Sequence, residues 1–218
     1  AQGVIILIKF EYVKTYNWVD AIRGMRNSWE SWSGMDSQEY FDRDREKFVT
    51  EIGPKDKKLM MTLVKAGSDH AKYMRMIVVS VDIIAPEYFW KEFDTYKVGT
   101  TANSTSMMHT LGRTPITEDM FSWEDVSEEH KQQYLTLINA IRDEWIASGK
   151  KKPSPEWRAM NQLVSIGFNY RRTVVLNYQV LRSMYHSRKN HRLSEWHDFC
   201  TWCETLPHAD LITYVKEK

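Results

Sequence analysis

The residues best suited to chemistry in this sequence lie in a long stretch without acidic side chains. From Trp157 through Ser194 there is no Asp or Glu, although 29 acidic residues among 218 would place about five there. Guanidinium groups are concentrated in the same stretch, and they supply paired donors shaped for phosphate oxygens. The stretch therefore indicates either an anion site or a basic face that is solvated or paired with acids such as Glu128, Glu129 and Asp143. Its basic residues are Arg158, Arg171, Arg172, Arg182, Arg188, Lys189 and Arg192.

A second segment without carboxylates runs from Val98 to His109 and is rich in hydroxyl and amide groups. Gly99 would let a ligand approach the backbone closely. Uncharged donors and acceptors suit a phosphate group or the edge of a base, but they are also common in solvated turns. Both interpretations stay open from the residues alone. The side chains concerned are Thr100, Thr101, Asn103, Ser104, Thr105 and Ser106.

Other patterns that would indicate chemistry are weak or missing. Cys200 and Cys203 stand near His186, His191 and His197, but a second CxxC pair is lacking, so we expect no metal site. The sequence has no GxSxG elbow, no P-loop and no GxGxxG turn. Nucleophilic catalysis by a side chain with an attached base therefore has no candidate.

Composition limits the possible partners. The formal net charge is +1, so nothing draws the whole molecule onto nucleic acid or an anionic membrane. Aromatic residues make up 13% of the chain, and although most large rings fill cores, this content favours a protein that stacks on bases or flavins. The apolar run Val4–Ile8 is too short to cross a bilayer, and two cysteines give no disulfide framework. We therefore expect a cytoplasmic protein.

Hydrophobic periodicity predicts an α/β chain, because it indicates both strands and helices, and the length favours a single domain over residues 1–218. Alternation predicts a strand at 4–13, and a β-branched run predicts a strand covered on both faces at 74–84. The segment 98–115 is expected to be a loop, and 150–155 to connect two helices. The predicted helices run from Asn17 through Trp32, from Pro54 to Gly67, from Pro86 through Phe93, from Ser127 to Ser148, over 155–165 and 174–188, and from Ser194 onward.

These regions, in their order and surroundings, resemble the flavin-dependent thymidylate synthase (ThyX) family. Lys65–His70 is similar to the family's helix end and flavin-facing turn, and Met74–Ile84 with the following Ala-Pro is similar to its strand and the start of its motif helix. After that helix the family has an Arg-His-Arg motif followed by Ser, Asn, Ser and Arg. This chain has, in the equivalent order and with one inserted residue near Ala102, Thr95, Tyr96 and Lys97, then Thr100, Asn103, Ser106 and Met108. The last signature region of the family is matched by Asn169–Arg172, Asn177–Arg188 and Leu193–Phe199.

The resemblance extends from the first strand to the last helix. It implies an α/β fold of the α+β type, with a small curved, mostly antiparallel sheet packed with long helices, assembled as a homotetramer whose active sites form between subunits. In that family FAD takes hydride from NADPH, methylenetetrahydrofolate supplies the carbon, and dUMP becomes dTMP without a protein nucleophile. Two alternatives stay open: a nucleotide-binding homologue without catalysis, and a basic patch that binds RNA or an acidic protein.

Carried over by residue, the resemblance implies three sets of site residues. The catalytic set is Arg188 and His197. Two family arginines and a histidine are replaced by Met108, Thr95 and Tyr96, and Lys189 and Arg192 could restore the lost charge unless the substrate differs. The substrate-binding set is Glu92, Ser104, Ser106, Arg171 and Arg172, and the cofactor-binding set is Ser68, His70, Lys97, Thr100, Asn103, His186, Arg188 and Arg192.

Overall fold

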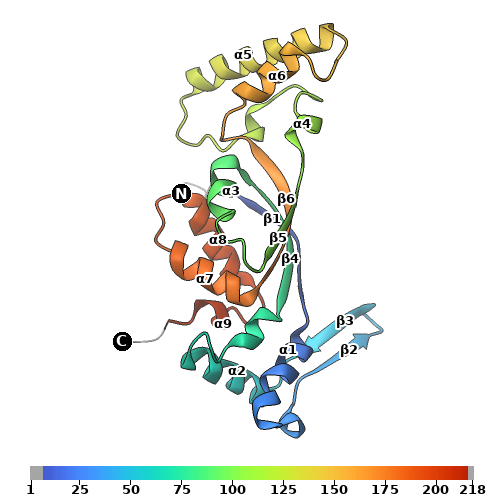
Figure 1. The fold of residues 1–218 in the computed structure, drawn as a ribbon, viewed down its shortest axis with the longest axis vertical. Coiled ribbons are helices and arrows are strands. Elements are labelled where there is room, and N and C mark those ends of the chain that lie inside the picture. Colours follow the sequence, from blue (N-terminus) through green and yellow to red (C-terminus); the bar gives the residue numbers. More distant parts are fainter. Residues whose placement is uncertain (1–6, 216–218) are drawn as a thin grey trace. The chain divides into compact units, whose positions relative to one another are not determined.

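The computed structural model describes residues 7–215 (Figure 1). These residues form two compact units. Within the described residues, unit 1 contains the chain up to Lys9 together with Asp82–Thr95 and Ala102–Thr173. Unit 2 contains Phe10–Val81, Tyr96–Thr101 and the chain from Val174 onward. The single domain expected over residues 1–218 stays a prediction.

A four-stranded antiparallel sheet has the strand order β1-β4-β6-β5. Burial along β4 alternates, with Val79, Val81, Ile83 and Ala85 fully buried between half-buried neighbours. One face of the strand packs into the core and the other is only partly covered, so the predicted cover on both faces is incomplete. This sheet and the helices confirm the predicted mixed fold with a small antiparallel sheet. The strands are β1 (Lys9–Tyr16), β4 (Val78–Pro86), β5 (Thr100–Ser104) and β6 (Asn169–Asn177).

Unit 1 has a helical core of its own. The Ser127 hydroxyl accepts a hydrogen bond from the His130 backbone N–H and starts a long helix at the predicted place. Leu111, Ile138 and Met160 belong to the buried apolar cluster beneath it. The helices of this unit are α3 (Glu87–Phe93), α4 (Met107–Thr110), α5 (Glu128–Ala147) and α6 (Pro155–Leu163).

Unit 2 joins helices to a separate two-stranded hairpin. Its second helix begins at Pro54 and ends before Gly67, whose φ of 116° is a conformation that L side chains rarely adopt. Trp18 packs edge-on against Tyr178 in the core, with ring centroids 5.0 Å apart. The elements are α1 (Trp18–Met25), β2 (Gln38–Asp42), β3 (Lys47–Glu51), α2 (Pro54–Ala66), α7 (Tyr178–Arg188), α8 (Ser194–Thr205) and α9 (Asp210–Thr213).

The helix predicted from Asn17 through Trp32 is wrong in its second half. The helix α1 ends at Met25, and short 3-10 turns follow. The Arg26 guanidinium donates to the backbone carbonyls of Ser31 and Gly34, which folds the chain back on itself. The tryptophan spacing continues past the helix end without a buried face, since Trp29 is 88% exposed.

Other boundaries also differ from the predictions. Residues Lys72–Arg75 form a 3-10 turn, so the strand predicted at 74–84 begins at Val78. The predicted loop at 98–115 contains β5 and α4, and residues 174–177 end a strand instead of starting a helix. In β1, Tyr12 has a φ of 53° and is 75% exposed, which breaks the predicted alternation; residues 4–6 of that prediction lie outside the described residues. The hairpin and α9 have no counterpart among the predicted elements.

No helix in residues 7–215 is both long and apolar enough to traverse a membrane. In the same range no cluster of three or more His, Cys, Asp or Glu side chains could hold a metal ion. Cys200 and Cys203 are free and buried, and burial raises the pKa of Cys200 to about 11. At neutral pH this side chain is therefore an unreactive thiol.

Candidate functional site

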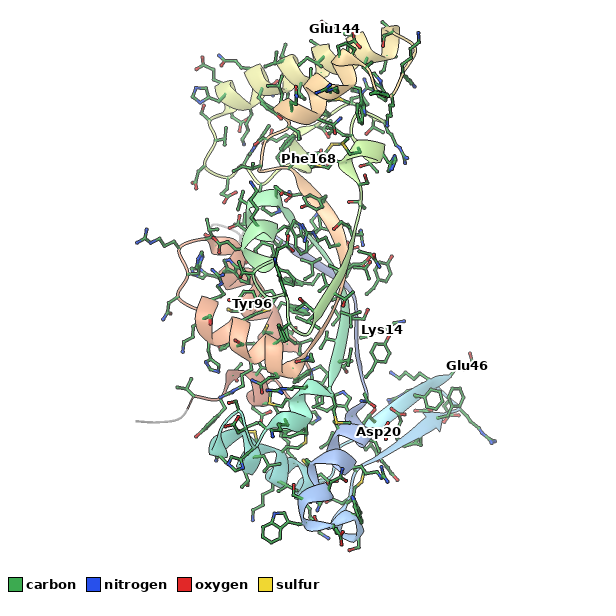
Figure 2. All side chains as sticks on the ribbon, in the orientation of Figure 1. Lys14, Asp20, Glu46, Tyr96, Glu144 and Phe168 are labelled. Atoms are coloured by element: carbon green, nitrogen blue, oxygen red, sulfur yellow. The ribbon has the colours of Figure 1, made fainter. Side chains whose placement is uncertain are left out.

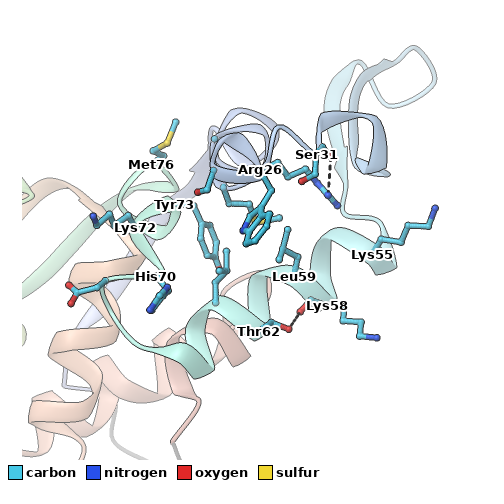
Figure 3. Close-up of a pocket in the computed structure, with 16 residues that line it drawn as sticks. Arg26, Ser31, Lys55, Lys58, Leu59, Thr62, His70, Lys72, Tyr73 and Met76 are labelled. Atoms are coloured by element: carbon cyan, nitrogen blue, oxygen red, sulfur yellow. Dashed lines mark hydrogen bonds between the residues drawn. The ribbon is translucent and has the colours of Figure 1, made fainter.

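A cavity of about 860 Å³ lies in unit 2 between α1, α2 and the turn Lys72–Arg75 (Figure 3). Figure 3 shows Leu59 and Tyr73 pointing toward this space, whereas Arg26 reaches toward Ser31 and the side chains of Lys55 and Lys58 extend away. Basic side chains outnumber the lining carboxylate of Asp69, so they raise the local potential without filling the space. The apolar lining consists of Met25, Trp29, Leu59, Leu63, Tyr73 and Met76, and the basic lining includes Lys55, Lys58, His70 and Lys72.

A buried ion pair holds one wall of the cavity. Arg26 donates from Nε to Oδ1 of Asp56 at 2.8 Å, and its Nη2 lies 2.6 Å from the same oxygen. The other carboxylate oxygen accepts from the backbone N–H groups of Asp36 and Ser37 at 2.9 and 2.8 Å. Because the Asp56 side chain is fully buried, these donors must balance the loss of its hydration. The network ties the end of α1 to the start of α2.

Of the predicted flavin-binding residues, His70 lines this cavity. Ser68 is exposed on the same turn and is not part of the lining. Sequence reasoning missed Arg26, Ser28 and Trp29, which also line the cavity, because their spacing was interpreted as a continuing amphipathic helix. For the turn that carries Ser68 and His70, the sequence signal was Gly67, which ends α2.

A second group of predicted residues surrounds the end of α7. The Nε of Arg188 donates to the Tyr96 hydroxyl at 2.9 Å. The guanidinium carbon lies 4.5 Å from the centroid of the buried Trp196 ring and 5.4 Å from that of Tyr96. Stacking on two aromatic faces together with a hydrogen bond fixes the plane of the arginine. We call Arg188, Tyr96 and Trp196 the arginine clamp.

Two more predicted residues are linked to the arginine clamp. The Thr100 hydroxyl donates to the Tyr96 carbonyl. The ring of His191 lies 6.2 Å from that of Trp196, and its carbonyl oxygen is 2.7 Å from Nε2 of the exposed His197. The structure therefore groups Arg188, His197 and Thr100. Lys97 follows Tyr96 in the sequence and Arg192 follows His191, and both side chains are exposed.

His186 is not part of this group. It lies two residues before Arg188 on α7, and side chains at this spacing do not share a helix face. Its buried Nε2 makes no hydrogen bond to the described residues, and burial, with the nearby charge of Arg182, lowers its pKa. Arg182 itself donates to the carbonyls of Leu211 and Ile212. This side of α7 therefore serves to hold the C-terminal segment around α9.

The two predicted phosphate anchors on β6 have different environments. Arg171 is 35% exposed and donates from Nη1 to Asp82 at 2.8 Å. Arg172 is 11% exposed, donates to Asp94 at 2.6 Å and lies over the Trp90 ring, 4.3 Å from its centroid. Adjacent residues on a strand face opposite ways, which explains the contrast. Arg172 has a packing role, whereas Arg171 is accessible from solvent.

The backbone of Arg171 pairs with a segment rich in hydroxyl groups. Thr105 donates to the Arg171 carbonyl through its backbone N–H at 2.9 Å and its hydroxyl at 3.2 Å. The predicted nucleotide contacts Ser104 and Ser106 flank it, Ser104 exposed at the end of β5 and Ser106 at the cap of α4. Arg171 and these serines therefore belong to one neighbourhood. Elsewhere in unit 1, Asn103 is exposed on β5 and Glu92 is half-buried on α3.

Asp82 and Asp94 pair with two arginines of the stretch that has no acidic residues. The Thr173 hydroxyl and the Arg171 guanidinium both donate to Asp82 and lower the pKa of its carboxyl group. Two arginines of the stretch are thus paired with acids from outside it. They are not the acids Glu128, Glu129 and Asp143 suggested by the sequence.

The fold of this chain is similar to those of solved structures. The crystal structure of thymidylate synthase X (ThyX) from Helicobacter pylori with FAD and dUMP matches 96% of this chain and 98% of that chain, with a TM-score of 0.69 and 14% sequence identity. The fold is ThyX-like. A second structure of the H. pylori ThyX, complexed with FAD and dUMP, matches 94% of this chain and 97% of that chain, with a TM-score of 0.67 and 14% identity.

No family model matches the sequence, and no curated protein matches it. At 14% identity the likeness to ThyX shows a shared fold and does not assign roles to residues.

Proposed function

We propose that this chain is a ThyX-like flavin-dependent enzyme that modifies C5 of a pyrimidine deoxynucleotide, dUMP or a close analogue, with NADPH and methylenetetrahydrofolate as co-substrates. The observation that supports it most is the shared fold over nearly the whole chain with a protein crystallised with FAD and dUMP. In such chemistry the protein positions its ligands and stabilises developing charge, and no nucleophile is needed. We also propose the cytoplasmic location and the homotetramer that the resemblance implies.

The cavity beside α2 fits a flavin. Its volume of about 860 Å³ is within the range of cofactor sites, which combine apolar walls with a few polar groups. Met25, Leu59 and Tyr73 would contact a flat ring, and His70 and Lys72 would face phosphate groups. A bound flavin supplies hydride transfer.

The arginine clamp fits the pyrimidine. A guanidinium whose plane is fixed before the substrate binds stabilises negative charge on a ring without reorganising during the reaction. Arg188 meets this condition because Tyr96 and Trp196 hold it on two sides. The Tyr96 hydroxyl thus takes a positioning role at the place where the resembled motif has histidine.

Flavin binding should depend on the cavity. The protein should purify yellow or bind added FAD, and Leu59→Trp should weaken that binding at least tenfold because the indole fills space between the walls. Titration followed by flavin fluorescence measures this, with the thermal midpoint as a check on folding. Leu137→Trp is the matched control, since Leu137 is 53% exposed on α5. Equal FAD affinity in both variants would place the flavin elsewhere.

Phosphate binding should depend on Arg171. Arg171→Ala should weaken dUMP binding by about 2 kcal/mol, roughly 30-fold, because a charge-assisted hydrogen bond is lost, while deoxyuridine binding hardly changes. Calorimetry with both ligands gives the comparison. Thr173→Ala is the control, because it also removes a donor to Asp82 but leaves the cation.

Arg172→Ala should lower thermal stability more than Arg171→Ala, since Arg172 packs on Trp90. If Arg171→Ala weakens nucleotide and nucleoside equally, Arg171 does not contact the phosphate.

A further inference from the structure

The hairpin of unit 2 is a small sheet of its own. Its strands pair antiparallel with Tyr40 opposite Val49 at the centre and Asp42 opposite Lys47 near the turn. Figure 2 labels Glu46 at this turn. Within residues 7–215 the sheet contains only β2 and β3, so each strand has one edge without a strand partner. Such edges present backbone N–H and C=O groups to which another strand can add.

Two aromatic rings are exposed on one face of the hairpin. Phe41 is 51% exposed and Phe48 is 71% exposed, and their ring centroids are 5.3 Å apart. Each ring therefore contacts chiefly the other on a surface open to water. An exposed apolar pair beside an open strand edge favours covering by another strand.

The sequence of β3 is complementary to itself in antiparallel pairing. Lys47 begins the strand and Glu51 ends it. With Val49 opposite Val49 of a second copy, Lys47 faces Glu51 of that copy, and two-fold symmetry repeats the ion pair. The same operation on β2 sets Gln38 opposite Asp42 and supplies no cation. The charges therefore favour pairing through β3 over pairing through β2, and because each β3 supplies both charges, the matching partner is a second copy of the same strand.

Two hydrogen bonds within the hairpin hold the Glu51 carboxylate in place. Its Oε2 accepts from Nε2 of Gln38 at 3.0 Å, and its Oε1 accepts from the Tyr40 hydroxyl at 2.8 Å. These hydrogen bonds lower its pKa, so the carboxylate is charged at neutral pH. Each oxygen keeps a lone pair for an ammonium group. Lys47 has no carboxylate within ion-pairing distance in the described part of the chain.

We propose that β3 pairs with β3 of a second copy of this chain, which joins the two hairpins into one four-stranded antiparallel sheet with its two-fold axis at Val49. Phe48 would then face Thr50 of the other copy, and both phenylalanine pairs would lie on the same face of the joined sheet. The contact uses residues outside the cavity and the arginine clamp, so it does not depend on the proposed activity.

A cysteine at the axis tests the pairing. Residues directly opposite on antiparallel strands have Cα atoms about 4.5 to 5.5 Å apart, which a disulfide can span. Under mild oxidation Val49→Cys should form a covalent dimer, identified by non-reducing electrophoresis and mass spectrometry of the linked peptide. Thr50→Cys is the control, because it faces position 48 of the other copy and not itself. The two native cysteines are buried.

Charge reversal supplies a second test in the Val49→Cys background. Lys47→Glu should reduce the dimer yield at least tenfold, because it faces Glu51 of the other copy, and adding Glu51→Lys should restore it. The clash of a glutamate at 47 with Asp42 in its own hairpin is the same in both variants, so rescue reports only pairing between copies. Equal cross-linking of Val49→Cys and Thr50→Cys, or a yield that ignores the charge at 47, would overturn the proposal.

Discussion

Arg188→Ala is expected to lower turnover at C5 of dUMP at least a hundredfold while the protein stays folded. The wild type should release tritium from 5-tritiated dUMP slowly but measurably when FAD, a reductant and methylenetetrahydrofolate are present. Removing a preorganised donor to developing charge typically costs a factor of 10² to 10³. The loss should exceed any change in FAD affinity, since Arg188 does not line the cavity.

The arginine clamp allows controls that separate charge from position. Arg188→Lys keeps the cation but loses the planar group that stacks on Trp196, so its rate should fall between those of the wild type and Arg188→Ala. Tyr96→Phe removes the hydroxyl that accepts from Nε and should lower the rate with little change in KM for dUMP. Arg158→Ala, an exposed arginine on α6, should leave the rate unchanged.

Each outcome of this experiment decides between functions. If Arg188→Ala and Arg158→Ala behave alike, Arg188 has no role in the reaction. If FAD and dUMP both bind but no tritium appears above the rate without enzyme, the thymidylate synthase proposal fails and a nucleotide-binding homologue takes its place. Binding of RNA instead of nucleotide would show as steep salt dependence without nucleotide preference.

The parts of the fold that were predictable from the sequence are those set by local signals. Pro54 and Gly67 mark both ends of α2, and the Ser127 cap marks the start of α5. Caps and breakers act within a few residues, so a short window of sequence contains them. The segments 98–104 and 169–177 lacked such signals. They are strands because β5 pairs with β6 far along the chain, as in the Thr105 to Arg171 hydrogen bonds.

The candidate site was predictable by residue type but not by environment. The concentration of arginines between 157 and 194 was visible, yet Arg188 meets Tyr96 across 92 positions of sequence. The contrast between Arg171 and Arg172 follows from strand alternation, which becomes evident only when β6 is recognised as a strand. Replacement of the motif histidine by Tyr96 signalled a change, but its pairing with Arg188 required the folded chain.

Removing the buried Asp56 carboxylate from the wall of the cavity should have the largest effect on stability. Asp56→Ala should destabilise unit 2 by about 3 to 5 kcal/mol, because Arg26 would be left buried without its counter-charge and two backbone N–H groups would lose their acceptor. Whole domains are stable by only about 5 to 15 kcal/mol, so part of the unit should open. Urea denaturation followed by circular dichroism measures the loss, and hydrogen exchange at α1 and α2 locates it.

An exposed ion pair in the same unit provides the matched control. Lys57 and Asp210 are 25% and 52% exposed at the side chain, so Asp210→Ala should cost less than about 1 kcal/mol. Arg26→Met combined with Asp56→Leu removes both charges, so it should recover the part of the loss that comes from the unpaired guanidinium, while the backbone N–H groups of Asp36 and Ser37 stay without their acceptor. If Asp56→Ala were no more damaging than Asp210→Ala, the buried pair would not hold this wall. Because Arg26 lines the cavity, Asp56→Ala should also weaken FAD binding at temperatures where the variant is still folded, whereas Asp210→Ala should not.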